Sequence, residues 1–235
     1  MSGLSFVSQG QGPWLLLLHA FPFDGRMWEP VVAELAQSHR LLIPDLRGFG
    51  RSRGLGPVKS IHQMADDVAE LMRAQGITGA AVLGLSMGGY VAMALRRQHP
   101  ELVEKLLLCD TRPDADDAEA RAGRAKQLAV LHGAGVGALV DSLLPRLVSA
   151  QAGEAVRERL RHIGIDQAVA SLSGAVVAMR DRPDASDVLR SCTVPVLGLA
   201  GAQDAVSPPE VVRAMAELAP RGGYVEIDDV GHLSC

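Results

Sequence analysis

The chain has 235 residues, of which 48% are hydrophobic, 21% charged and only 3% aromatic, and its formal net charge is -4. This length allows one large α/β domain with a well-buried core, or such a domain with an insertion. The acidic balance and the lack of a basic cluster exclude nucleic acid and anionic membranes as expected partners, which leaves small or neutral molecules.

The cysteines and the amino-terminal segment indicate the cellular setting. The chain has three cysteines, an odd number, at Cys109, Cys192 and Cys235. Their spacing fits neither a metal site nor a C-x-x-C pair, so we expect reduced thiols and no metal site. Residues 1–12 lack the basic start and long apolar centre of a secretory signal, and the longest apolar run, 14–18, is too short to span a bilayer. We therefore expect a cytoplasmic protein with no membrane partner.

The first part of the chain alternates between strand and helix patterns. Continuous apolar runs at 13–18 and 40–44 predict strands that are buried on both faces. Between them, apolar residues at helical spacing predict a helix over 28–36. A second helix is predicted over 61–74, because Ser60 opens it with the spacing of a capping box.

The alternation continues up to Asp110. A strand is predicted at 80–83, a helix at 90–95 and another strand at 103–109. Strands that alternate with helices predict an α/β fold, with a mostly parallel twisted sheet and helices on both faces.

A different pattern occupies residues 111–191. The segment is rich in Ala, Arg and Asp and has no convincing strand, so we expect a helical lid inserted over the carboxyl edge of the sheet. The stretch 133–137 is rich in glycine but follows no strand and lacks a lysine, so it predicts a helix junction rather than a phosphate loop. The helices of the lid are predicted at 118–131, 136–144, 154–162 and 168–179.

Regular α/β structure resumes after the insertion. A predicted strand at 194–200 is followed by a helix that Ser207 and Glu210 open as a capping box. The last strand is predicted at 223–228. The core domain is thus expected to comprise residues 1–110 and 192–235.

Ser86 stands at the sharpest predicted turn of the chain. Gly84 and Gly88 flank it in the pattern G-x-S-x-G, between a buried strand and a helix. Such a turn holds its central residue at positive φ and needs neighbours without side chains, which is the geometry of a nucleophile elbow. The alternative is a helix-capping serine in a glycine-rich turn, and the flanking strand and helix favour the nucleophile.

A serine nucleophile needs a base to take its proton and a carboxylate to orient that base. In the chain order serine, acid, histidine, the candidates are Asp204 and His232, each of which follows a predicted strand. Asp110 is the rival acid, because it also ends a strand. His19 lies near the same edge but precedes the serine, so we expect it to bond the backbone of its loop instead.

The oxyanion of an acyl-transfer reaction needs two backbone N–H donors. One is expected from Met87, directly after the nucleophile, and the other from Phe21, in the loop after the first strand. Phe21 and Phe23, together with residues of the insertion, are also expected to line an apolar acyl pocket. The alternative for both rings is a place in the core.

These motifs resemble the α/β-hydrolase-fold serine hydrolases, most closely the branch of 3-oxoadipate enol-lactonases and carboxylesterases. The resemblance departs at Ala20, where the family usually has glycine. It implies a carboxylic ester hydrolase that cleaves small apolar esters or lactones through an acyl-enzyme, with the triad Ser86, Asp204 and His232 and with no cofactor. The matching pieces are distributed along the chain outside the insertion, namely at 19–28, 45–52, 84–89, 201–208 and 231–232.

Members of this family usually continue beyond the catalytic histidine into a helix that packs on the sheet, whereas this sequence stops at Cys235. Either the sequence is truncated, which we expect, or the protein covers that face in another way. A bare apolar face at that place would favour association, so a homodimer is a further expectation.

Other functions stay open beside esterase and lactonase, which use the same triad. Pro22, beside the oxyanion loop, resembles cofactor-free haloperoxidases and perhydrolases of this fold, which predicts peracid formation from acetate and peroxide. A non-catalytic receptor for a small ligand is the alternative from a different class, and the complete triad argues against it.

Overall fold

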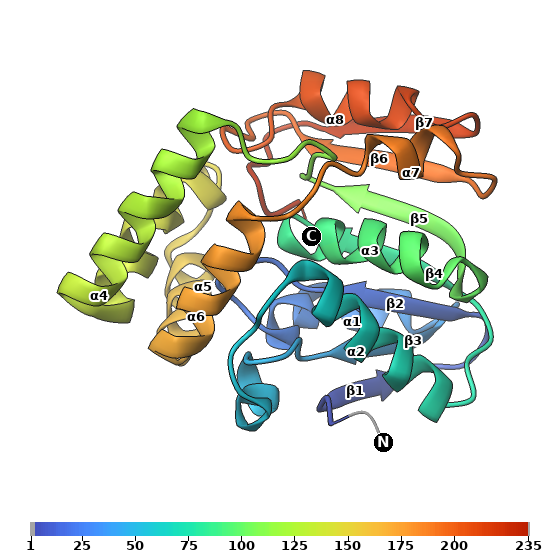
Figure 1. Ribbon diagram of the computed structural model, residues 1–235, viewed down its shortest axis with the longest axis horizontal. Coiled ribbons are helices and arrows are strands. Elements are labelled where there is room, and N and C mark those ends of the chain that lie inside the picture. Colours follow the sequence, from blue (N-terminus) through green and yellow to red (C-terminus); the bar gives the residue numbers. More distant parts are fainter. Residues whose placement is uncertain (1–2, 235) are drawn as a thin grey trace.

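The computed structural model describes residues 3–234 and is built around a seven-stranded sheet (Figure 1). The strand order is β1-β3-β2-β4-β5-β6-β7, and all neighbours are parallel except β1 and β3. This arrangement confirms the predicted mostly parallel sheet. The strands are β1 (Phe6–Gln9), β2 (Trp14–Leu18), β3 (Arg40–Pro44), β4 (Ala80–Leu85), β5 (Val103–Cys109), β6 (Val196–Gly201) and β7 (Gly222–Ile227).

Helices cover both faces of this sheet, because the inner strands are apolar on both sides. In β2, Leu16 and Leu18 pack into the larger core cluster, whereas Leu15 and Leu17 pack into a second cluster with Trp28. The α1 side chains join the second cluster, and α2 and α3 fill the first. The core helices are α1 (Glu29–Leu35), α2 (Ile61–Ala74), α3 (Met87–Gln98), α7 (Ser186–Arg190) and α8 (Pro209–Glu217), with short 3₁₀ turns η1 (Gly25–Trp28), η2 (Gly50–Leu55) and η3 (Pro100–Leu102).

One strand, β1, was not predicted from the sequence. It is only four residues long, it lies antiparallel to β3 at the edge, and Val7 on it is 43% exposed. A short edge strand that faces solvent lacks the apolar run that identified the inner strands.

The two predicted capping boxes have different outcomes. At α2, the Gln63 N–H donates to Ser60 Oγ at 3.0 Å, and the Gln63 side chain accepts from the N–H of Lys59. The box predicted for α8 is wrong, because the helix begins after Pro208 without a side-chain cap. The Ser207 N–H donates instead to the Asp204 carboxylate at 2.9 Å.

The inserted segment forms three helices beyond the carboxyl ends of the strands (Figure 1). They are α4 (Ala118–Leu147), α5 (Glu154–Ile165) and α6 (Val169–Arg180), which we call the lid. The predicted junction within 133–137 is confirmed, since Gly135 interrupts α4 with φ 86° and ψ 179°. Helix α7 also falls within 111–191 but contacts α3 and α8 of the core, and the boundaries of the insertion stay a prediction.

Among the described residues, α4 has the length and apolar composition of a helix that could cross a membrane. Its break at Gly135 and its contacts with α5 and α6 are those of a lid helix in this fold. On the α1 side of the sheet, Leu83 and Leu199 are only partly buried and Val225 is 45% exposed. Cys109 and Cys192 are buried as thiols, and Cys235 lies outside the described residues.

Candidate active site

Ser86 occupies the turn between β4 and α3 with φ 54° and ψ -113°. Its N–H donates to the carbonyl of Cys109 at 2.9 Å, which ties the turn to the end of β5. A side chain at Gly84 would put its Cβ 2.3 Å from the carbonyl oxygen of Gly88, and one at Gly88 would come within 2.0 Å of the Leu18 carbonyl. The positive φ and the two tight glycines are the geometry that the sequence pattern predicted.

Three side chains from separate strand ends meet at this turn. The Ser86 hydroxyl lies 2.8 Å from Nε2 of His232, and Nδ1 of His232 lies 2.8 Å from Oδ2 of Asp204. The other Asp204 oxygen accepts from the N–H groups of Val206 and Ser207 at 2.7 and 2.9 Å. Because a carboxylate can only accept, Nδ1 carries the proton and Nε2 is left to accept from the serine.

This chain of contacts is shielded from solvent. The side chain of His232 is 1% exposed and that of Asp204 is not exposed at all. In such surroundings a hydrogen-bonded imidazole holds one orientation, and water competes little for its ring nitrogens. The structure thus brings together all three residues that the sequence put forward as a triad.

Asp110, the rival acid, has a different set of partners. Its Oδ1 accepts from the N–H of Gly201 at 2.9 Å, and its Oδ2 accepts from the N–H of Ser234 at 3.2 Å. Burial raises the pKa of this carboxyl to about 6, against the opposing effects of the Ser234 hydrogen bond and the nearby His232. Asp110 therefore joins the ends of β5 and β6 to the loop of His232, while the ring of His232 is bonded by Asp204.

His19 has the backbone role expected from its position. The N–H of Leu46 donates to Nε2 at 3.0 Å, so Nδ1 carries the proton and donates to the carbonyl of Ala20 at 3.1 Å. Burial is the largest effect on this ring and lowers its pKa. A neutral His19 thus links the loop after β2 to the loop after β3.

The two expected oxyanion donors follow β4 and β2, which are neighbouring strands of the sheet. Met87 is the first residue of α3, and the first N–H groups of a helix have no acceptor within it. Phe21 lies in the loop after β2, where the N–H of Phe23 closes a turn on the carbonyl of Ala20 at 3.0 Å. Their function as an oxyanion hole stays a prediction.

The two phenylalanines of this loop differ in their surroundings. Phe21 is 7% exposed and packs edge-on against Phe49 in the same core cluster as Met87. Phe23 is fully buried among the residues of the second cluster, which includes Trp28. Phe23 therefore has the place in the core that was the alternative for this ring, and its contribution to an acyl pocket stays a prediction.

A second polar cluster, which the sequence analysis missed, holds the two ends of the lid together. Arg182 is 5% exposed, forms an ion pair with Asp116 and stacks on the ring of Tyr90 at 3.9 Å, four residues after the nucleophile. It also donates to the carbonyls of Met179 and Asp114. A buried arginine that joins distant segments leaves no periodic signal, so the sequence could not have identified it.

The fold and this Ser–His–Asp arrangement define the class of protein. The alpha/beta hydrolase fold family matches residues 13–134, and the chain belongs to this family.

Several known proteins have structures or sequences similar to this chain. A thermophilic esterase from Thermogutta terrifontis, solved with malate bound, is 38% identical with a TM-score of 0.93, over 98% of this chain and 86% of the other. The enol-lactonase from Burkholderia xenovorans LB400 is 29% identical with a TM-score of 0.89, over 98% and 90%. BpoC of Mycobacterium tuberculosis, provisionally named a non-heme bromoperoxidase, is 29% identical over 99% of this chain and 92% of its own.

Proposed function

We propose that this protein is a serine hydrolase that cleaves carboxylic esters or lactones of small apolar substrates, with Ser86, His232 and Asp204 as its triad. The observation that carries the proposal is the pair of 2.8 Å contacts, from Ser86 Oγ to His232 Nε2 and from His232 Nδ1 to Asp204 Oδ2. The similarity to an esterase and to an enol-lactonase supports the same reaction class.

The first half of the reaction forms an acyl-enzyme. Ser86 Oγ attacks the carbonyl carbon of the ester while His232 Nε2 takes the hydroxyl proton. The bond to the leaving oxygen then breaks, and His232 returns the proton to that oxygen, so an alcohol leaves. Asp204 keeps the proton on Nδ1 and stabilises the imidazolium that forms between these steps.

The second half restores the serine. A water molecule gives its proton to His232 and attacks the acyl carbon, and the carboxylic acid leaves as Ser86 regains its proton. In both halves the negative carbonyl oxygen would be bound by the N–H groups of Phe21 and Met87. Removal of one such donor costs on the order of 3 kcal/mol in comparable sites. Every step uses only the substrate, water, and side-chain and backbone groups of this chain.

The test is hydrolysis of p-nitrophenyl acetate and butyrate, followed by a panel of esters and lactones of graded acyl length. We expect turnover by the wild type and none above background by Ser86→Ala. Equal turnover by both proteins would contradict the proposal. Specific binding of the panel compounds without any turnover that depends on Ser86 would favour the small-ligand receptor.

A perhydrolase is the second candidate, and the similarity to BpoC together with Pro22 in the oxyanion loop favours it. In this case peroxide would replace water in the second half of the reaction, and the acyl group would leave as a peracid. Incubation with acetate and hydrogen peroxide, followed by assay of peracetic acid, separates the two activities. Peracid formation that depends on Ser86 would support the perhydrolase.

The proposal also includes a cytoplasmic location and a homodimer. The partly buried Leu83 and Leu199 and the exposed Val225 lie on one face of the sheet, which supports self-association. Light scattering coupled to size-exclusion chromatography gives the mass in solution, and a monomer at micromolar concentration would contradict the homodimer.

A further inference from the structure

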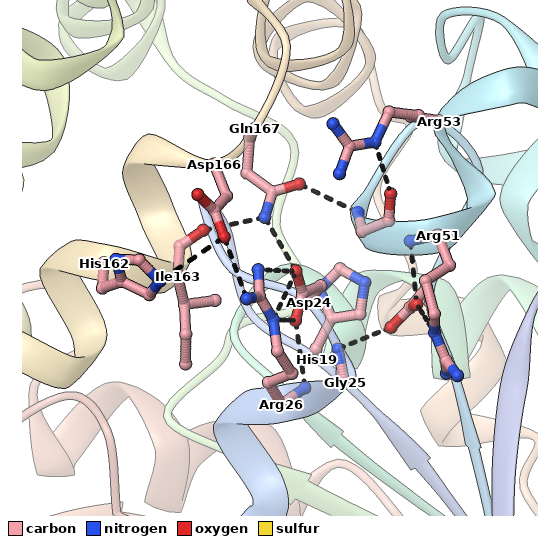
Figure 2. A network of polar contacts seen from close by, with 12 residues as sticks. His19, Asp24, Gly25, Arg26, Arg51, Arg53, His162, Ile163, Asp166 and Gln167 are labelled. Atoms are coloured by element: carbon pink, nitrogen blue, oxygen red, sulfur yellow. Dashed lines mark hydrogen bonds and ion pairs between the residues drawn. The ribbon is translucent and has the colours of Figure 1, made fainter.

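The turn between α5 and α6 brings the lid down onto two loops of the core. Figure 2 shows Asp166 and Gln167 of this turn above Asp24 and Arg26, which belong to the segment that follows the oxyanion loop. Gln167 is 5% exposed, although it is a long polar side chain. A buried amide of this kind is stable only where each polar atom has a partner.

Each polar atom of the Gln167 amide has such a partner, and the partners belong to three different segments. Nε2 donates to Oδ2 of Asp24 at 2.8 Å and to the carbonyl of Ile163 in α5, also at 2.8 Å. Oε1 accepts from the N–H of Gly50 at 2.9 Å. One side chain thus fastens the lid both to the loop after β2 and to the loop after β3 (Figure 2).

Asp24 lies three positions after the expected oxyanion donor Phe21 in the same segment of the chain. Its side chain is 1% exposed, and it accepts from the backbone N–H and the guanidinium of Arg26. Burial opposes ionisation of this carboxyl, but the hydrogen bonds from Arg26 and Gln167 outweigh it and hold the pKa below its usual value. Asp24 begins η1 only three residues after Phe21, so a shift of Asp24 would move the short loop between them.

The ion pair beside Gln167 is a weaker link. Arg26 contacts Asp166 of the lid at 2.9 Å, but their side chains are 45% and 36% exposed. Water and salt weaken exposed ion pairs. A buried amide that loses its hydrogen-bond partner stays out of water with no hydrogen bond to offset the desolvation, so its loss costs more. Arg159 of α5 also donates to the carbonyl of Arg26 at 2.6 Å, in a contact that is exposed to solvent. The buried contact of the lid with this segment is the one made by Gln167.

We propose that Gln167 is a positioning residue that couples the docking of the lid to the placement of the Phe21 N–H in the oxyanion hole. The inference rests on the proposed function, because it assigns the Phe21 loop to oxyanion binding. It adds that closure of the lid completes the catalytic machinery as well as covering the substrate.

The test compares Gln167→Glu, Asp24→Asn and the double variant. The glutamate keeps the acceptor for Gly50 but puts an oxygen against Asp24 and against the carbonyl of Ile163. In the double variant, the amide of residue 24 can donate to the new carboxylate, so one of these two repulsions disappears. Asp141→Asn is the matched control, because Asp141 forms an exposed ion pair with Arg161 within the lid and contacts neither loop.

The informative substrate is p-nitrophenyl acetate, whose small acyl group leaves little for a lid to contact. We expect Gln167→Glu to lower kcat about tenfold or more with KM changed less than about twofold, because a misplaced donor affects the transition state. The double variant should recover part of this loss, and Asp141→Asn should keep the wild-type kcat. A wild-type kcat for Gln167→Glu, or a loss that the double variant does not relieve, would overturn the proposal.

Hydrogen exchange provides a readout that does not depend on the substrate. In Gln167→Glu, we expect faster exchange of the amides in 21–28 and 48–52, with the control unchanged. Unchanged exchange in these segments would overturn the coupling whether or not the protein hydrolyses esters. If the wild type hydrolyses no ester, the proposed function fails, and the exchange data alone show whether the lid holds the loop.

Discussion

Gly88 lies so close to Leu18 that a methyl group on the glycine would come within 2.0 Å of the leucine carbonyl oxygen. The first turn of α3 therefore rests directly on the end of β2. This contact sets the position of Ser86 relative to the loop that begins at His19, so the nucleophile and the expected oxyanion donor share one rigid support.

Gly88→Ala should displace α3 and lower the free energy of unfolding by roughly 2–3 kcal/mol, because the clash is with backbone and no rotamer relieves it. Activity on p-nitrophenyl acetate should fall with it. Gly137→Ala is the control, since a Cβ at this helical glycine meets nothing within 4 Å. In urea unfolding, Gly137→Ala should raise the free energy of unfolding by about 0.5–1 kcal/mol. Equal free energies of unfolding for the two variants would contradict the packing described.

Asp204→Asn should lower kcat by about 10⁴-fold, because an amide no longer fixes the proton on Nδ1 of His232. Asp110→Asn should cost far less, since Asp110 bonds backbone groups of Gly201 and Ser234 rather than the ring. Steady-state kinetics of both variants on one ester decide between the two acids. The reverse ranking would show that Asp110 orients the base.

Asp110 should also give the protein a pH-dependent stability. Its pKa rises from 3.8 to about 6 on folding because of burial, so between these values the folded state binds more protons than the unfolded chain. The free energy of unfolding should therefore rise as the pH falls from 7 to 4, and the Asp110 carboxyl should contribute about 3 kcal/mol to this rise. The buried His19, whose pKa is lowered, acts in the opposite direction.

Comparison with Asp110→Asn isolates the effect, since both proteins contain His19. Urea unfolding at several pH values should show the wild type gaining stability relative to the variant as the pH falls. Parallel curves for the two proteins would mean that the carboxyl is not held at a raised pKa.

Arg182→Met should destabilise the protein by about 2–3 kcal/mol, because the buried carboxylate of Asp116 loses one of its two arginine partners and keeps only its pair with Arg124. Arg180→Met removes an arginine two positions away whose pair with Asp181 is exposed, and it should leave the unfolding midpoint unchanged. Thermal unfolding of both variants checks this difference. Equal midpoints would contradict the role of Arg182 in joining the two ends of the lid.

The chemistry of this site was predictable because it follows from local rules applied at strand ends. The glycines around Ser86 identified the turn, and the chain order of serine, acid and histidine identified Asp204 and His232. Parallel strands bring their carboxyl ends to one edge, so residues far apart in sequence were expected to meet there.

The contacts between the lid and the core were not predictable in the same way. Gln167 and Asp24 are 143 positions apart, and Arg182 and Asp116 are 66 apart. Neither pair has a period or a motif, because such contacts depend on how two segments dock. The error at Ser207 has a different, local cause, since Asp204, three positions earlier, accepts the N–H that Glu210 would accept in a capping box.

The most direct test of the central claim is covalent labelling of the protein with a fluorophosphonate, followed by peptide mass spectrometry. We expect stoichiometric phosphonylation of Ser86 in the wild type, none in Ser86→Ala, and strongly slowed labelling in His232→Ala. Labelling at another residue, or labelling of Ser86 that is as fast without His232, would contradict a serine nucleophile activated by this histidine.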